Sequence, residues 1–135
     1  MKRQNGSCLC GGVRFELHGP LRPLLACHCV QCRKTSGHYW VATNVSYDKL
    51  VLTNDDGLKW YASSNSAQRG FCQQCGASLF WQWHNSGSIS VAAGALDGPT
   101  GCHIEAHIFT AHKGDYYQLP VTENVRPLEL DVDVK

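Results

Sequence analysis

A net charge of +1 over 135 residues, of which 17% are charged and 43% hydrophobic, predicts a single folded domain over residues 1–135 rather than a disordered segment. Because nucleic-acid-binding domains carry a basic face, this balance argues against nucleic acid as the main partner. No apolar stretch follows the charged residues at the start, and none elsewhere is long enough to cross a membrane, so we expect no signal peptide, no membrane partner and a cytoplasmic location.

The sequence predicts an all-β domain of antiparallel sheets with little helix. Its 13 glycines and 5 prolines separate short runs that are rich in β-branched and aromatic residues. In the first run, Val13, Phe15 and Leu17 alternate with Arg14 and Glu16, which is the period of a half-buried strand. Further strands are expected over Tyr39–Val45, Leu50–Thr53, Lys59–Ala62, Ser78–Trp83, Ser88–Ala92 and His103–Thr110.

Two local features interrupt these strands. A single short turn of helix is expected over Val30–Ser36. The sequence at 85–87, Asn-Ser-Gly, predicts a hairpin turn between two strands. In the strand before that turn, strict alternation places Leu79, Trp81 and Trp83 on one face.

Seven of the eight cysteines lie in three tight clusters. Zinc binds four soft ligands in a tetrahedron, and thiols two or three residues apart can reach one ion. Because no secretory signal is predicted, we interpret these cysteines as metal ligands in a reducing compartment rather than as disulfide partners. The clusters are Cys8 and Cys10; Cys27, Cys29 and Cys32; and Cys72 and Cys75.

The number of clustered thiols predicts two zinc ions per chain. Seven ligands divide into one complete tetrahedron and one site with an open corner, and a complete site is usually structural whereas an open one is usually catalytic. In an extended strand residues i and i+2 point to the same face, so Cys8 converges with Cys10. The spacing leaves the pairing of the clusters open. Cys8 and Cys10 could share an ion with Cys72 and Cys75, or with Cys29 and Cys32.

Three segments around the cysteines resemble one family. Gly6–Val13, Cys27–Gly37 and Arg69–Gly76 are similar, in order and spacing, to the glutathione-dependent formaldehyde-activating enzymes, a group that includes centromere protein V. The resemblance covers nearly the whole chain and implies a β-tent of antiparallel sheets stabilised by two zinc ions. It implies a structural zinc held by Cys8, Cys10, Cys72 and Cys75, and a second, three-coordinate zinc held by Cys27, Cys29 and Cys32.

The resemblance also implies an activity. Members of the family condense formaldehyde with glutathione to S-(hydroxymethyl)glutathione, formally a carbon–sulfur lyase reaction. Zinc with an open corner can deprotonate a thiol and polarise a carbonyl, so a small-molecule thiol such as glutathione could complete the shell of the second ion. The alternative is a non-catalytic, zinc-stabilised module that binds glutathione or a protein partner, because one fold can host many functions.

Four further residues each have a functional and a structural interpretation. Cys102 is either a small buried side chain or the fourth ligand of the second zinc. His28 lies between two cysteines and, in a strand, points away from them, which favours a role behind the ligands or at the surface. His107 either lines the pocket or is an ordinary half-buried histidine. Arg69 binds either a glutathione carboxylate or a structural salt-bridge partner.

Aromatic residues and one polar loop complete the candidates. Tryptophans are mostly core residues, but one or two could wall a cleft over the second zinc. The loop Ser63–Ser66 carries hydrogen-bonding side chains and is either a substrate loop or a solvated one. The tryptophans are Trp40, Trp60, Trp81 and Trp83.

Overall fold

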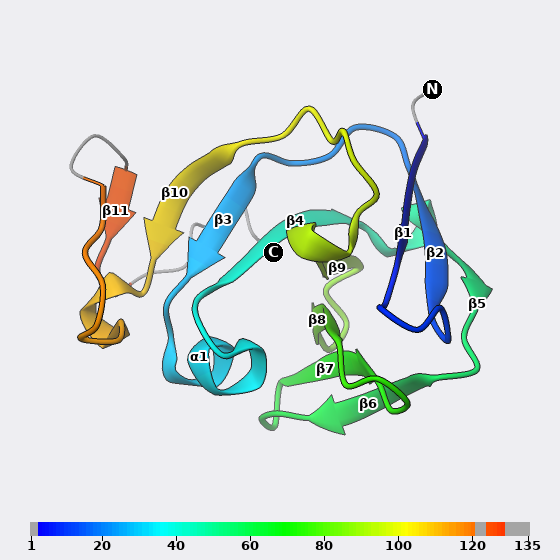
Figure 1. Ribbon diagram of the computed structural model, residues 1–135, viewed down its shortest axis with the longest axis horizontal. Coiled ribbons are helices and arrows are strands. Elements are labelled where there is room, and N and C mark those ends of the chain that lie inside the picture. Colours follow the sequence, from blue (N-terminus) through cyan, green and yellow to red (C-terminus); the bar gives the residue numbers. More distant parts are fainter. Residues whose placement is uncertain (1–2, 121–123, 129–135) are drawn as a thin grey trace.

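The computed structural model describes residues 3–120 and 124–128, and Figure 1 shows a fold made almost wholly of strands, as the sequence predicted. Over these residues the one α-helix is α1 (Val30–Ser36), and short 3₁₀ turns occupy Tyr47–Lys49, Ala93–Ala95 and Thr110–His112. Within the described residues no helix is long and apolar enough to span a bilayer. The strands are β1 (Arg3–Ser7), β2 (Arg14–His18), β3 (Leu24–Cys27), β4 (Trp40–Ser46), β5 (Leu50–Asn54), β6 (Leu58–Ala62), β7 (Ala67–Cys72), β8 (Ser78–Trp83), β9 (Ser88–Ala92), β10 (Ile104–Ile108) and β11 (Asn124–Arg126).

The strands form two sheets. A three-stranded sheet has the order β1-β2-β5, and an eight-stranded sheet has the order β11-β10-β3-β4-β9-β8-β7-β6. Most neighbours are antiparallel, as predicted, but β10 runs parallel to both β3 and β11. The larger sheet is therefore mixed, because β10 returns to the edge of β3 after the chain has built the whole β4–β9 half.

One face of the eight-stranded sheet packs against the three-stranded sheet. Side chains alternate between faces along a strand, so Val45 of β4, Phe80 of β8 and Val91 of β9 point into a common core. From the smaller sheet, β2 adds Phe15 and Leu17 to this core. Phe15 and Phe80 meet edge to face with ring centroids 5.3 Å apart. The alternation predicted for β2 is thus confirmed.

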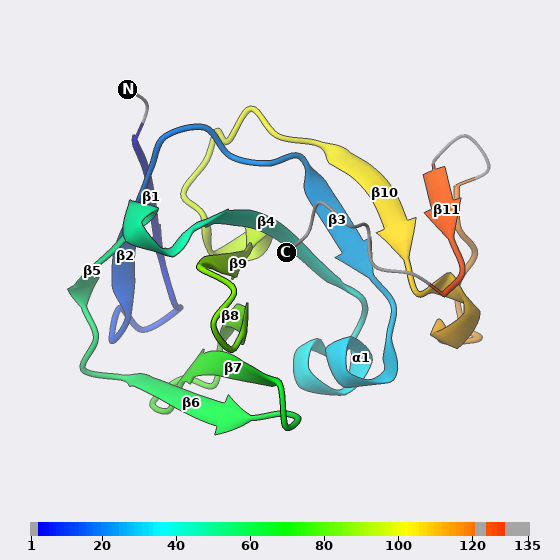
Figure 2. The ribbon, with the colours of Figure 1, turned by 180° about the vertical axis from the view of Figure 1, so that it is seen from behind.

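The opposite face of the eight-stranded sheet looks toward α1. Trp40 of β4 and Trp81 of β8 pack there beside Cys32 of the helix. Figures 1 and 2 show α1 next to the β6–β7 turn, where the side-chain amide of Gln31 donates to the Ser63 carbonyl oxygen over 3.2 Å. Trp40 and Trp81, whose side chains point away from the core between the sheets, therefore belong to a second, separate cluster around Cys32.

Two local predictions agree with the backbone. The α1 helix covers the predicted range, and Cys29 caps it by accepting the backbone N–H of Cys32. Between β8 and β9, Asn85 and Gly87 adopt positive φ angles of 63° and 76°. Such angles are those that asparagine and glycine tolerate best, so this hairpin turn follows directly from its sequence.

A β-bulge in β8 changes one predicted face. Strict alternation groups Leu79 with Trp81 and Trp83, but the register of β8 against β7 shifts between Ser78 and Phe80. Leu79 is the additional residue, and it packs beside Phe80 in the core. The two tryptophans keep their common face without Leu79.

Replacing Phe15 with alanine should remove the ring that joins the two sheets. Phe15 is 1% exposed, and large-to-small changes at buried phenylalanines cost about 3–5 kcal/mol of unfolding free energy. Urea denaturation followed by circular dichroism measures this loss. Val51→Ala, on an exposed position of β5, is the matched control and should change the unfolding free energy by less than about 1 kcal/mol. Equal losses in the two variants would contradict this description of the core.

Candidate metal centres and the adjoining pocket

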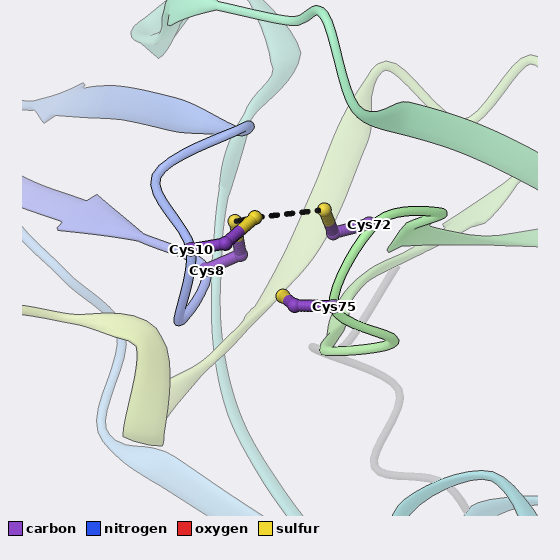
Figure 3. Close-up of side chains that lie close together, drawn as sticks. All are labelled: Cys8, Cys10, Cys72 and Cys75. Carbon is purple, nitrogen blue, oxygen red and sulfur yellow. Dashed lines mark hydrogen bonds between the residues drawn. The ribbon is translucent and has the colours of Figure 1, made fainter.

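Four cysteine sulfurs converge where two turns meet. Cys8 and Cys10 come from the β1–β2 turn, whereas Cys72 ends β7 and Cys75 lies in the turn that follows it. Figure 3 shows the four side chains directed toward one another. All four sulfurs lie within 4.8 Å of one another, and Cys10 Sγ is 3.7 Å from both Cys8 Sγ and Cys72 Sγ. Of the two pairings left open by the sequence, the fold thus brings the first cluster to the third.

The spacing of these sulfurs fits a tetrahedral zinc ion. Zinc–sulfur bonds of about 2.3 Å at tetrahedral angles place ligand sulfurs about 3.8 Å apart. Backbone N–H groups also point at the sulfurs, because Val13 donates to Cys8 Sγ over 3.2 Å and Gly12 donates to Cys10 Sγ over 3.4 Å. The backbone N–H of Cys10 lowers the pKa of Cys75 to about 6, which favours the thiolate that a metal requires.

Two glycines allow the turns to approach so closely. Gly76 follows the second pair with a φ of 83°, and its N–H donates to the Cys72 carbonyl oxygen over 2.7 Å. Gly57 donates its N–H to the Gly12 carbonyl oxygen over 2.8 Å, and a Cβ atom at Gly57 would lie 2.8 Å from Cys72 Sγ. The absence of a side chain at Gly57 therefore leaves room for the sulfur.

The remaining three clustered cysteines gather at the start of α1. Cys27 ends β3, Cys29 caps the helix, and Cys32 lies in its first turn, with all three sulfurs within 4.8 Å of one another. Hydrogen bonds from Cys27 and Cys32 lower the pKa of Cys29 to about 2, whereas the contacts with Cys29 and Cys32 raise the pKa of Cys27. The cluster therefore favours a thiolate at Cys29, which is the form that binds zinc.

Cys102 belongs to neither group of sulfurs. It is half-buried, and its sulfur lies 3.7 Å from the Thr100 carbonyl oxygen. Among the described residues, no further Cys, His, Asp or Glu joins the cluster at α1. The arrangement is thus one group of four thiols and one group of three.

Arg69 connects β7 to the three-thiol cluster. It is only 9% exposed, and its Nη2 donates toward Cys32 Sγ over 3.5 Å while its Nε donates to Gln31 Oε1 over 3.2 Å. Its guanidinium also lies 5.8 Å from the Trp40 ring centroid. These contacts are not a salt bridge, because the partners are an amide oxygen and a thiol, and binding of a substrate carboxylate by Arg69 stays a prediction.

A pocket of about 440 Å³ opens beside the three thiols. Three of the four tryptophans line it, whereas Trp60 stacks on Phe80 elsewhere. Two serines of the predicted polar loop, Ser64 and Ser66, also face this pocket. The lining tryptophans are Trp40, Trp81 and Trp83.

His28 lies behind the cluster, on the other face of β3. It is fully buried, and its Nε2 is 2.9 Å from His107 Nδ1 while its Nδ1 contacts the Tyr117 hydroxyl. Burial lowers the pKa of His28 to about 4, so the ring is neutral near pH 7. His107 therefore lies behind the strand and does not line the pocket, and Tyr117 is a partner that sequence reasoning missed.

Three more pocket residues were not among the candidate site residues of the sequence analysis. Arg22 precedes β3, Phe109 follows β10, and His112 ends a 3₁₀ turn, yet all three line the pocket beside the thiols. No motif links these positions, because only the pairing of β10 with β3 and of β3 with β4 brings them together.

The chain is similar in sequence to proteins of one known family. The glutathione-dependent formaldehyde-activating enzyme family matches residues 3–112. The chain belongs to this family. A Halomonas elongata protein named "Putative glutathione-dependent formaldehyde-activating enzyme" is 35% identical over an alignment length of 134 residues. The match covers 90% of this chain and 83% of that protein.

Two other similar proteins agree with membership of the formaldehyde-activating family. A Schizosaccharomyces pombe protein named "Uncharacterized lyase" is 28% identical over 118 residues, covering 87% of this chain and 85% of its own length. The crystal structure of a Rhodobacter sphaeroides protein superposes with a TM-score of 0.58 at 25% identity, over 72% of this chain and 91% of that chain.

We expect this member of the formaldehyde-activating family to purify with two zinc ions per chain, because one group of four thiols and one of three can each hold one ion. Plasma mass spectrometry of carefully reduced protein measures the metal content. Cys102→Ser should retain both ions, since Cys102 belongs to neither group. A single ion or none in the reduced wild type would contradict the expectation.

The two thiol groups should also differ in their effect on stability. Cys72 is buried in the core between the sheets, and metal binding at a complete structural site contributes folding free energy on the order of 10 kcal/mol. Cys72→Ser should therefore unfold or precipitate the protein. Cys32→Ser should remain folded and lose about one metal ion, because the three-thiol group lies outside that core.

Thermal melting combined with metal analysis separates these outcomes. Cys102→Ser again serves as the control for loss of a thiol outside both groups. Similar melting temperatures for the Cys72 and Cys32 variants would show that the two groups do not divide structural and functional roles.

Proposed function

We propose that this protein is a zinc-dependent enzyme of the carbon–sulfur lyase type that acts on thiol–aldehyde adducts, in the manner of an S-(hydroxymethyl)glutathione synthase. The observation that carries the proposal is the three-thiol cluster, which borders a pocket and has no fourth Cys, His, Asp or Glu among the described residues. The family and the names of its relatives support a glutathione-linked reaction of formaldehyde. The free state of all eight cysteines is compatible with a reducing compartment such as the cytoplasm.

The two thiol groups would hold the two zinc ions in different roles. Zinc at the three-thiol group would supply a Lewis acid that favours the thiolate form of a thiol and polarises a carbonyl. The structural ion would be held by Cys8, Cys10, Cys72 and Cys75, and the second ion by Cys27, Cys29 and Cys32.

The chain's own residues provide positioning. Arg69 bonds both Gln31 and Cys32, so it fixes the helix that carries the cluster against β7. Its positive charge also stabilises nearby thiolates. The walls of the pocket would hold a thiol and an aldehyde next to each other, which converts a bimolecular encounter into a local one.

The chemical step balances without an oxidant or reductant. The sulfur of the thiol forms a bond to the aldehyde carbon, the carbon–oxygen double bond becomes a single bond, and the thiol's proton is transferred to the oxygen. The reverse reaction releases the aldehyde by breaking the carbon–sulfur bond. Proximity is the main contribution that the pocket makes in either direction.

The proposed activity predicts faster exchange between free and adduct forms of formaldehyde. Two-dimensional exchange spectroscopy with labelled formaldehyde and glutathione measures the rate against a protein-free control, since the spontaneous reaction also proceeds. We expect wild type to exceed the control by about tenfold or more, from positioning alone. Cys29→Ser, which removes a thiol of the pocket cluster, should return the rate to the control value.

Two results would contradict this activity. Equal rates for buffer, wild type and Cys29→Ser would exclude formaldehyde activation. Glutathione binding without acceleration would instead support the non-catalytic binding module.

A further inference from the structure

The pocket is much larger than formaldehyde requires. A water molecule occupies about 30 Å³ of liquid volume, and formaldehyde has only two heavy atoms, whereas the pocket measures about 440 Å³. Most of the space beside the thiols must therefore take another part of the adduct. The chemistry of the walls indicates what that part is.

Two tryptophans of β8 form one wall. Trp81 packs against the cluster that contains Cys32, and Trp83 meets Trp81 edge to face with ring centroids 5.6 Å apart. Trp83 remains 38% exposed, so its ring is accessible from solvent. Exposed indole surface beside a pocket favours an apolar or ring-shaped ligand, because both gain from removing that surface from water.

Phe109 supplies an independent sign of a built site. It lines the same pocket directly after β10, and its backbone has a φ of 55° and a ψ of 38°. This left-handed conformation is disfavoured for a bulky side chain, and residues held in such conformations cluster at active sites and ligand-binding segments. The neighbouring Ile108 and Leu25 extend the apolar surface along the pocket.

Several polar groups on the walls already have protein partners, although among the described residues the indole nitrogen of Trp40 has no hydrogen-bond partner for its N–H. Arg69 donates to Gln31 and toward Cys32, and the Ser90 hydroxyl accepts a hydrogen bond from the Asn44 amide over 3.1 Å. The hydroxyl groups of Ser64 and Ser66 lie 3.4 Å apart and contact each other. A polar peptide filling the pocket would have to compete with these bonds, whereas an apolar group would not.

We propose that the pocket binds thiol–aldehyde adducts that carry an apolar, ring-sized substituent, and that this substituent lies against Trp81, Trp83 and Phe109. This inference rests on the proposed function. The reaction is RSH + R′CHO giving RS–CH(OH)–R′, with the thiol proton transferred to the oxygen. The apolar group can enter as R′ of the aldehyde or as R of the thiol, and the two sources are distinguished experimentally.

The test compares three substrate pairs with the purified metal-loaded protein. They are glutathione with formaldehyde, glutathione with phenylacetaldehyde, and 2-phenylethanethiol with formaldehyde. Exchange spectroscopy gives the acceleration of each pair over its own protein-free control. We expect at least one phenyl-bearing pair to be accelerated about tenfold more than glutathione with formaldehyde, the gain typical of one well-placed aromatic contact. Acceleration of the phenylacetaldehyde pair assigns the apolar group to the aldehyde, and acceleration of the phenylethanethiol pair assigns it to the thiol.

A matched pair of variants locates the contact. Trp83→Ala removes an accessible ring that lines the pocket, and Tyr61→Ala removes a 62% exposed ring of β6 that does not. Both changes are at accessible positions, so both proteins should fold. Binding of unreactive 3-phenylpropanol, measured by calorimetry, provides a readout that is independent of turnover. Trp83→Ala should weaken this binding about tenfold, whereas Tyr61→Ala should change it less than about twofold.

The outcomes separate this inference from the proposed function. If glutathione with formaldehyde is accelerated most and Trp83→Ala leaves alcohol binding unchanged, the apolar specificity is wrong while the proposed function stands. If no pair is accelerated but the alcohol binds through Trp83, the proposed function is wrong while the apolar character of the pocket stands.

Discussion

The convergence of four thiols from two turns is the constraint on which the rest of the structure depends. The β1–β2 turn belongs to the three-stranded sheet, and the end of β7 with the turn after it belongs to the eight-stranded sheet, so the group connects the two sheets. Cys8 and Cys72 are also members of the core between the sheets. The position of one sheet over the other is therefore set by packing and by the same sulfurs that suit a zinc ion. Because a cross-link over a long loop removes much freedom from the unfolded chain, such a connection is especially effective here.

The alternation of side chains along the strands assigns the two faces of the large sheet to different roles. In β4, Val45 packs in the core while Trp40 faces the three-thiol cluster. In β9, Val91 faces the core while Ser90 lines the pocket. One sheet thus provides the stable interior and the wall of the candidate site, with no separate scaffold for either. The pocket lies on the same face of the large sheet as α1. The thiols at the start of α1 line one part of this pocket.

Much of this could be predicted from the sequence where the signal was local. The range of α1, the strands β8 and β9, and the division of seven thiols into four and three all follow from spacing and alternation. The strand β1 was missed because Gln4, Asn5 and Gly6 carry no apolar alternation, and its conformation depends on pairing with β2. A cleft walled by tryptophans was predicted, but the contribution of Phe109 was not, since Phe109 and the thiols meet only through the parallel pairing of β10 with β3. Non-local pairing leaves no periodic trace in the residues that it joins.

The contact between His28 and Tyr117 has a consequence for the order in which the chain matures during synthesis. Their separation of 89 residues means that the strand carrying Cys27 gains its rear support only after Tyr117 has also left the ribosome. The three thiols at α1, in contrast, lie within one short segment and emerge together. A ribosome-bound chain therefore presents this candidate metal-binding loop and Trp40 well before it possesses Trp81, Trp83 and Phe109, which complete the pocket around it. The group of three thiols and most of the pocket walls are therefore completed at different moments, by parts of the sequence that meet only when the chain folds.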